Sequence, residues 1–419
     1  MTIHSGWVEV LKSEVPEAFT KNPPFVPAAA FIDGMPLLMA SSTLRKWEDL
    51  IRYNFCNPIR RFFMMGCKVV VLAFDDYLHV PSSKAITQAN RSKNKAPFEF
   101  DERQKLETVM PADYNSRMSN RVYKRRVIDL ITETVVDYLG LKRYEKLIID
   151  YVECPVVFEL DPSTMKPAYK YLVDMPSLGE CDVKFTRWCR KFGDMVVHSV
   201  DGDFIPIALM EYETQYNTFM HHNQGNKEEA AQNSKKSRGK IHNIALYRLE
   251  FGAQQGPNQK TAAGGKQARP PQHPVPQVVS RKPKRSMEFV NVGMLYEEML
   301  HIMRGWLAPA VNLTTMKKWA LSVEPGNSSS SNSSSAKGGS DHGSLDPCKR
   351  ELLSHTARVF SLLIALTGTD FTRGLPQLGP SKIWEFMDSQ SVWNSIRSEE
   401  HTSELQSPCN LVCRLLLEK

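Results

Sequence analysis

Short runs rich in Val, Ile, Leu and Ala limit most strongly how this chain can fold. Three of these runs lead directly into an aspartate. The runs cover residues 28–32, 68–74, 147–152 and 195–200. Val- and Ile-rich, largely apolar runs of this length are typical of strands buried on both faces of a parallel sheet. Between the runs, residues 121–139 and 182–192 repeat apolar side chains at helical spacing. This alternation predicts an α/β fold with a mostly parallel sheet flanked by helices.

The size and composition of the chain exclude several classes of protein. A length of 419 residues predicts about two or three folded units, and 42% hydrophobic residues exclude a wholly disordered chain. No stretch approaches the ~20 apolar residues of a membrane span, and the N-terminus lacks a secretory signal, so we expect a soluble intracellular protein. The eight cysteines form no C-x-x-C pair, which favours reduced thiols, and the net charge of +7 only weakly suggests a polyanionic partner.

Two insertions interrupt the ordered part of the chain. Residues 223–291 are rich in Gln, Asn, Gly, Pro and Lys, and residues 325–345 are mostly Ser, Asn and Gly. Neither has enough apolar side chains to offset the entropy lost on ordering, so we expect both to be flexible. Within the first, residues 241–251 are apolar and could rejoin the core as strands or a helix. Between the insertions, residues 292–324 form a predicted helical segment.

The last 23 residues, 397–419, differ in character from the rest of the chain. Their sequence, R-S-E-E-H-T-S-E-L-Q-S-P-C-N-L-V-C-R-L-L-L-E-K, is similar to the translation of a sequencing-library adapter. We therefore expect them not to be native, and the native protein to continue past Ile396. The alternative is a genuine amphipathic tail.

Asp33, Asp75 and Asp201 each follow one of the apolar runs. In a parallel sheet these positions fall at the carboxyl edge, where open α/β sheets build their sites. Converging carboxylates repel one another unless a cation lies between them, and hard oxygen ligands suit Mg²⁺ or Mn²⁺. Further candidates for the same site are Glu180, Asp182, Asp203 and Asp370. Ordinary turns and an acidic first helical turn are the structural alternatives, and a glycosyltransferase D-x-D pair is a third alternative.

Seven acidic residues thus stand in order in short motifs. The motifs are Asp33 in F-I-D-G, Asp75 in V-L-A-F-D-D, Glu180 and Asp182 in G-E-C-D, Asp201 and Asp203 in D-G-D, and Asp370 in L-T-G-T-D-F. In this order they resemble the motifs of the flap endonuclease and nucleotide-excision-repair nuclease superfamily, whose core is a PIN-like α/β fold. Asp182 replaces the second Glu of the family motif G-E-A-E. The resemblance covers residues 28–396 apart from the two insertions.

The resemblance implies a metal-dependent phosphodiester hydrolase. The seven acidic residues would bind two Mg²⁺ ions, with Mn²⁺ as an alternative, for an in-line displacement. Lys84 and Arg91, seven residues apart and so on one helix face, would contact the scissile phosphate as catalytic and nucleic-acid-binding cations. Without the resemblance, a solvated helix face explains them equally well. Gly379 and Lys382 would hold a duplex phosphate away from the cut.

The domain organisation implied by the resemblance follows the composition. An N-terminal extension (residues 1–27) precedes a nuclease N-terminal region (residues 28–222) with a helical cap at about residues 84–140. After the two insertions and the helical segment, residues 346–396 would form a truncated internal region with a helix–two-turn–helix motif. The basic cluster at residues 282–285 is either a nuclear localisation signal or a solvated linker.

The leading functional expectation is a structure-selective 5′ nuclease of the flap endonuclease or 5′→3′ exonuclease type, acting on DNA with a 5′ flap or a single-strand/duplex junction. The resemblance implies a nuclear protein of DNA repair or replication, with a cytoplasmic location as the alternative. A 5′→3′ exoribonuclease is the alternative within the same fold, since RNA and DNA differ at the 2′-OH. A catalytically silent, nucleic-acid-binding scaffold is the alternative from another class.

Overall fold

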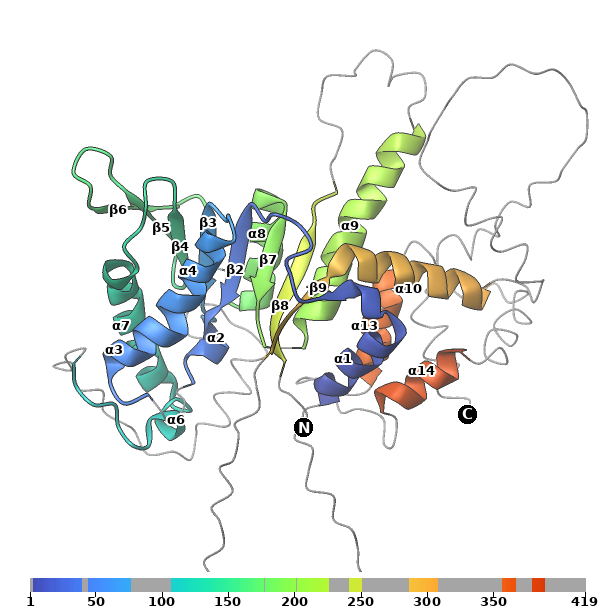
Figure 1. Cartoon of the computed structure of the whole chain (residues 1–419), viewed down its shortest axis with the longest axis horizontal. Coiled ribbons are helices and arrows are strands. Elements are labelled where there is room, and N and C mark those ends of the chain that lie inside the picture. The colour runs from blue at the N-terminus through green and yellow to red at the C-terminus, as the bar shows by residue number, and fades with distance from the viewer. Residues whose placement is uncertain are drawn as a thin grey trace, which may run out of the picture.

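The computed structural model describes residues 3–39, 44–76, 107–176, 178–200, 202–225, 241–250, 286–307, 356–366 and 379–388. These residues form an α/β structure in which one large mixed sheet is flanked by helices on both faces (Figure 1). The predicted α/β class and the mostly parallel centre of the sheet are therefore confirmed. None of the helices in these ranges combines the length and the apolar character needed to cross a membrane.

The sheet has the strand order β1-β9-β8-β7-β2-β3-β4-β5-β6. The strands are β1 (Phe19–Thr20), β2 (Ala29–Asp33), β3 (Val69–Ala73), β4 (Lys146–Asp150), β5 (Val156–Leu160), β6 (Pro167–Tyr171), β7 (Met195–His198), β8 (Ile244–Glu250) and β9 (Ser286–Asn291). Strands β8, β7, β2, β3 and β4 run parallel, and antiparallel strands continue the sheet at both edges. The four predicted apolar runs are β2, β3, β4 and β7, adjacent in the sheet, because only central strands bury both faces.

Successive side chains of β2 point to opposite faces of the sheet, and those of residues 29–32 are all apolar, so helices must cover both faces. Ala30 and Ile32 belong to one apolar core, whereas Ala29 and Phe31 belong to the other. The first core is closed by α3 (Trp47–Leu50), η2 (Ile51–Cys56), α4 (Asn57–Met64), α6 (Tyr114–Arg117) and α7 (Arg121–Leu139). The second is closed by α1 (Ile3–Glu14), η1 (Pro16–Ala18), α8 (Cys181–Phe192), α9 (Phe204–Gly225), α10 (Val292–Leu307), α13 (Thr356–Leu366) and α14 (Pro380–Asp388). The result is a three-layer α/β/α arrangement.

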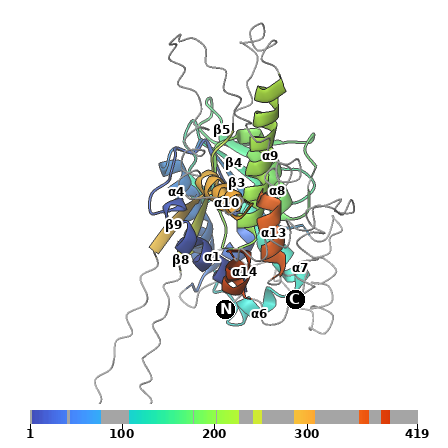
Figure 2. The same ribbon diagram turned by 90° about the vertical axis from the view of Figure 1, so that its right-hand side faces the viewer.

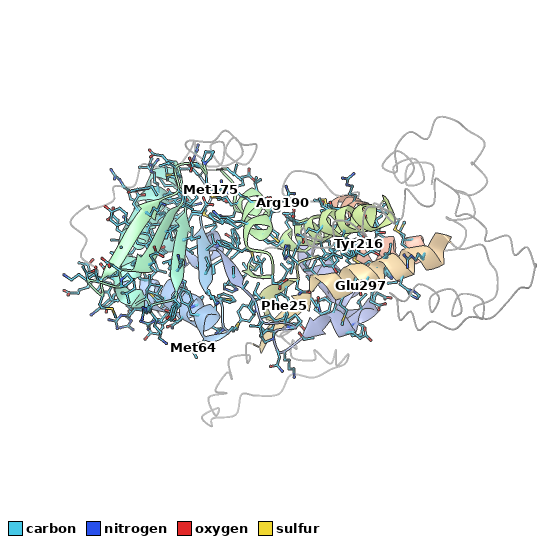
Figure 3. The ribbon with its side chains drawn as sticks, turned by 90° about the horizontal axis from the view of Figure 1, so that it is seen from above. Phe25, Met64, Met175, Arg190, Tyr216 and Glu297 are labelled. Atoms are coloured by element: carbon cyan, nitrogen blue, oxygen red, sulfur yellow. The ribbon has the colours of Figure 1, made fainter. Side chains whose placement is uncertain are left out.

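Four helices of the second layer come from distant parts of the chain. Figure 2 shows α1, α10, α13 and α14 grouped on the side that faces the viewer. An ion pair joins α8 to α9 in this layer, with 2.8 Å between Arg190 Nη2 and Glu211 Oε2. Arg190 lies beside α9 in the view from above (Figure 3). The layer is therefore held by apolar packing and by at least one charged contact between helices.

The helix predicted over residues 121–139 is confirmed at both ends. Asn120 caps its N-terminus, with its side-chain oxygen accepting from the N–H groups of Val122 (3.0 Å) and Tyr123 (3.1 Å). Gly140 ends the helix with φ 60°, the left-handed conformation that glycine adopts without steric cost. The helix predicted over residues 182–192 is also confirmed, as α8.

The expected flexible insertion over residues 223–291 needs a correction. Strands β8 and β9 lie inside it, and β8 pairs in parallel with β7. The apolar side chains of β8 fill the core next to β7, so burial outweighs the polar composition of the flanking residues. The apolar piece at residues 241–251 therefore rejoins the core, as strand β8. Residues 325–345 and 397–419 lie outside the described residues.

The expected N-terminal extension and helical cap are described in part. Residues 1–27 contain α1 and β1, and β1 pairs with β9, so this segment belongs to the fold. Of the expected cap, residues 84–106 lie outside the described residues, while α6 and α7 belong to the layer that closes the first core. In the region 346–396, α13 and α14 are described, but the segment between them is not.

Candidate active site

The strand register brings the ends of β2, β3 and β7 together. Asp33 is opposite Ala73 of β3, and Ile32 is opposite His198 of β7. Asp75 follows two residues after the end of β3, at the same carboxyl edge of the sheet as Asp33. Strands β3 and β4 lie on one side of β2 and strands β7 and β8 on the other, so the chain reverses its order at β2. Such a switch point at the carboxyl edge is where open α/β sheets bind ligands.

The carboxylate of Asp33 is buried and held from two sides. Its side chain is 6% exposed. Oδ1 accepts from the N–H of Met35 at 3.0 Å, which caps the short helix α2 (Gly34–Leu37), and Oδ2 accepts from Ser199 Oγ at 3.0 Å. Ser199 directly follows β7, so this hydrogen bond joins the ends of two neighbouring strands.

Gly34 permits the close approach of the two aspartate-bearing strands. A Cβ at this position would lie 2.8 Å from the carbonyl oxygen of Ala73 and would overlap the ring of Phe74. Only glycine therefore fits between the turn after β2 and the end of β3. Close packing therefore explains the glycine of the D-G dipeptide, independently of any chemistry at Asp33.

Asp75 is tied to the first turn of α8. Its Oδ1 accepts from the N–H of Cys181 at 2.7 Å, and the N–H of Asp76 donates to the carbonyl of Gly179 at 2.8 Å. Glu180 is the N-cap residue of α8, and Asp182 is in its first turn. These contacts place the predicted Glu180–Asp182 pair next to the predicted strand-end aspartate.

The thiol of Cys181 lies close enough to both Asp75 and Asp33 to be affected by their charges. Burial raises the pKa of Cys181, and the charges of Asp75 and Asp33 raise it further. Both carboxylates therefore act on the same buried atom. The thiol stays protonated, so the donors available at this edge are hard carboxylate oxygens, which fit Mg²⁺ or Mn²⁺ better than a soft thiolate would.

A buried lysine, which the motifs did not single out, holds the ends of β3 and β4. Lys184 is fully buried, and its Nζ donates to the carbonyls of Phe74 (2.8 Å), Asp150 (3.1 Å) and Tyr151 (2.9 Å). Because Phe74 directly precedes Asp75, this ammonium fixes the backbone that carries the site aspartate. The sequence could have pointed to Lys184 by its spacing, since it stands four residues after Glu180 and therefore one turn further along the same face of α8.

Asp150 ends an apolar strand as Asp33 does, yet its carboxylate has a structural role. Lys184 Nζ lies 3.2 Å from Oδ1, while Arg187 Nη2 and Trp188 Nε1 each lie 2.6 Å from Oδ2. Two cations and an indole N–H thus compensate a fully buried charge. The same local pattern therefore serves a structural ion network at β4 and a candidate site at β2 and β3.

Lys124 of α7 brings a cation toward Asp75. Burial lowers the pKa of Lys124, and the charge of Asp75 acts in the opposite direction, which places the two groups near each other. The sequence shows residues 91–126 as generally rich in Lys and Arg, but it does not distinguish this lysine from its neighbours.

The remaining predicted site residues are placed as follows. Asp203 lies in the turn before α9, where its carbonyl accepts from the N–H of Ile207 at 3.3 Å. Gly379 and the exposed Lys382 lie at the start of α14, which packs on α1. Lys84, Arg91, Asp201 and Asp370 lie outside the described residues. Within the ranges that the structure describes, no three His, Cys, Asp or Glu side chains are grouped closely enough to hold a metal ion.

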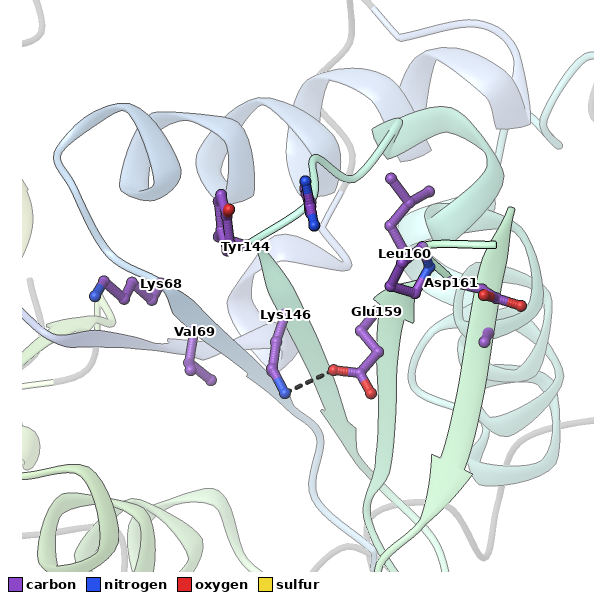
Figure 4. A pocket seen from close by; sticks show the side chains of 10 residues that line it. Lys68, Val69, Tyr144, Lys146, Glu159, Leu160 and Asp161 are labelled. Carbon is purple, nitrogen blue, oxygen red and sulfur yellow. Dashed lines mark ion pairs between the residues drawn. The ribbon is translucent and has the colours of Figure 1, made fainter. Parts of the chain in front are cut away.

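A cavity of about 940 Å³ lies at the opposite, amino edge of the central strands (Figure 4). Its lining includes Lys68, Val69 and Lys146, at the start of β3 and β4, and an ion pair of 2.6 Å joins Lys146 to Glu159. Open α/β sheets bind ligands at the carboxyl edge instead, so this cavity does not belong to the candidate site.

Neither known protein-family models nor curated proteins match this chain. The residues at the carboxyl edge and their geometry therefore carry the functional inference.

Proposed function

We propose that the protein is a PIN-like, metal-dependent 5′ nuclease of the flap endonuclease or 5′→3′ exonuclease type, which hydrolyses DNA phosphodiesters at flaps or single-strand/duplex junctions. The observation that most supports this proposal is the convergence of Asp33 and Asp75 at the switch point of the sheet, next to the Glu180–Asp182 turn. The order of the acidic motifs supports the same class. A scaffold protein would have no chemical reason to keep mutually repelling carboxylates together.

Asp33 and Asp75 would be the central metal ligands, supported by Glu180, Asp182, Asp201, Asp203 and Asp370. Bound Mg²⁺ would supply Lewis-acid stabilisation of the phosphodiester and activation of a water. The chain itself would orient the ligands: Ser199 and the N–H of Met35 hold Asp33, and the N–H of Cys181 holds Asp75. Rigid support of this kind keeps ligands within the narrow range of positions that catalysis needs.

The cations near the site would bind the substrate. Lys124 would face a phosphate oxygen from α7, and Lys84 and Arg91 would act from the predicted cap. A phosphate beside these groups would find positive charge on one side and metal on the other. This division assigns substrate positioning to cations and metal binding to carboxylates.

A cleavage assay tests the proposal. Labelled flap, duplex and single-stranded DNA, and the matching RNAs, are incubated with Mg²⁺ and wild-type protein, Asp33→Asn, Asp75→Asn or the control Asp137→Asn. Asp137 is exposed on α7. We expect each site variant to lose at least about a hundredfold in rate while the control keeps its activity.

Each alternative has its own outcome in this assay. Equal cleavage by wild type and both site variants would refute the metal-site assignment. Selective cleavage of RNA would move the proposal to the exoribonuclease class. Absence of any cutting by the folded full chain would favour the scaffold.

A further inference from the structure

A groove rich in aromatic rings lies between α7 and the β5–β6 hairpin. Its cavity is about 400 Å³, and four rings line it, those of Tyr151, Phe158, Tyr169 and Tyr171. The ring centroids of Phe158 and Tyr169 are 6.2 Å apart, and those of Tyr169 and Tyr171 are 5.8 Å apart in an edge-to-face arrangement. We call this feature the aromatic groove.

The strand register explains why the rings face one way. Phe158 pairs with Tyr169, and Val156 pairs with Tyr171, so these side chains share one face of the hairpin. Strand β6 is the last strand of the sheet, and all its residues are exposed. Tyr169 is 65% and Tyr171 55% exposed, so a cluster of rings faces solvent at a sheet edge. Exposed aromatic clusters and open strand edges both mark interaction sites.

The charge of the aromatic groove is negative. Asp129 and Glu133 of α7 and Glu153 of the β4–β5 turn line it, against one cation, Arg125. Burial and then the charge of Asp129 raise the pKa of Tyr151, so a carboxylate lies close to this ring. Rings combined with an excess of carboxylates attract a cation, because ring faces carry negative potential.

We propose that the aromatic groove and the outer edge of β6 bind an extended, Arg- or Lys-bearing segment of a partner protein. Within the described part of the chain, β6 has a strand partner on one side only, so its other side can accept a further strand. Alternate side chains of an added strand would point toward the rings and carboxylates. A nucleic acid fits less well, since its phosphates would meet three carboxylates.

The chain's own basic cluster next to β9 is too close to β9 to reach the aromatic groove. Residues 281–285 directly precede β9, and the strand order puts seven spacings between β9 and β6. Seven spacings amount to about 34 Å, whereas five extended residues span at most about 18 Å. This cluster therefore does not supply the cation, and the proposal assigns the cation to a partner protein whose charge complements the groove.

Fluorescence anisotropy of the full chain tests the proposal. The probe is a fluorescein-labelled peptide of Val-Arg repeated four times, compared with Val-Glu repeated four times and with a Val-Arg peptide N-methylated at alternate residues. We expect only the first peptide to bind well. Tyr171→Ala and Glu133→Lys should each weaken its binding by about tenfold or more.

Two variants serve as matched controls. Tyr144→Ala removes a ring that is 74% exposed at the opposite end of the sheet, and Asp137→Lys reverses a charge one turn further along α7, outside the groove lining. Both should bind the peptide as wild type does. All four positions are exposed, so circular dichroism should show folded variants.

Three results would overturn the proposal: equal binding of the acidic peptide, no binding of the basic peptide, or unchanged affinity in both groove variants. A labelled oligothymidylate provides a further test. If it binds and its binding is lost in Tyr171→Ala, the groove belongs to nucleic acid and not to a basic protein segment.

Discussion

The backbone N–H of Cys181 donates to Oδ1 of Asp75 at 2.7 Å, joining residues 106 positions apart in the sequence. This hydrogen bond brings the start of α8 to the end of β3. The predicted acidic pair of α8 thereby reaches the strand-end aspartates. A backbone donor cannot be removed by side-chain substitution, so this contact persists in variants that keep α8 in place.

Gly34→Ala should disturb the aspartate-bearing turn. The new Cβ would lie 2.8 Å from the carbonyl of Ala73, so β2 and β3 must move apart. We expect a loss of about 1–3 kcal/mol in the free energy of unfolding, measured by urea denaturation, with a parallel loss of cleavage.

Gly305→Ala in α10 is the matched control. No atom lies within 4 Å of the added Cβ, and alanine favours a helix. This variant should be neutral or more stable by up to about 1 kcal/mol. Equal destabilisation of both variants would mean that the close approach at Gly34 is not the cause.

Lys184→Met should strongly destabilise the protein. It would leave the buried carboxylate of Asp150 and three carbonyls without their ammonium partner. Breaking such a buried ion pair costs about 3–5 kcal/mol in the free energy of unfolding. Urea denaturation measures this loss, and Lys170→Met, at an exposed residue of β6, should change stability little. A small effect at Lys184 would show that the carbonyls of β3 and β4 do not depend on it.

Lys124→Ala should reduce turnover more than substrate affinity. If its ammonium contacts a phosphate in the transition state, kcat for flap cleavage falls by about a hundredfold while KM changes little. Lys124→Arg should keep part of the rate, since it keeps the charge. Lys142→Ala, at an exposed position beyond α7, is the control. A rise in KM alone would limit Lys124 to ground-state binding.

Glu213 should make stability depend on pH. Its Oε1 accepts from the N–H of Ala357 at 2.7 Å at the start of α13, and burial raises its pKa to about 7 from the ordinary 4.5. Because the folded protein holds the proton more tightly, this contribution is full below pH 4.5 and is lost as the pH rises toward 7. It amounts to at most about 3 kcal/mol.

Comparison with Glu213→Gln isolates this contribution. The amide does not titrate, so the difference in free energy of unfolding between the two proteins should change between pH 4.5 and 7 and be constant outside that range. Urea denaturation across this range measures it. A difference that stays constant throughout would show that Glu213 titrates normally in the folded protein.

Much of the sheet could be predicted because its central strands have few alternatives. Runs such as residues 68–74 can bury their side chains only inside a sheet covered on both faces. The helix α7 was equally clear, since Asn120 and Gly140 mark its ends by local conformational preference. By contrast, β8 and β9 lie in a stretch whose overall composition is polar. Their place in the sheet depends on the pairing of β8 with β7 and of β9 with β8, which are distant in the sequence.

The order of acidic residues and apolar runs was sufficient to predict the α/β class and to propose Asp33 and Asp75 for one site. Both properties are local, since they depend on periodicity and on the residue that follows a strand. Only the tertiary structure separated Asp150 from Asp75, although each stands at the end of a buried strand. Lys184 and Arg187 of α8 neutralise Asp150 and Trp188 donates to it, whereas Asp75 receives the backbone N–H of Cys181. The role of a carboxylate depends on the charges and donors that folding places around it, and those come from distant parts of the chain.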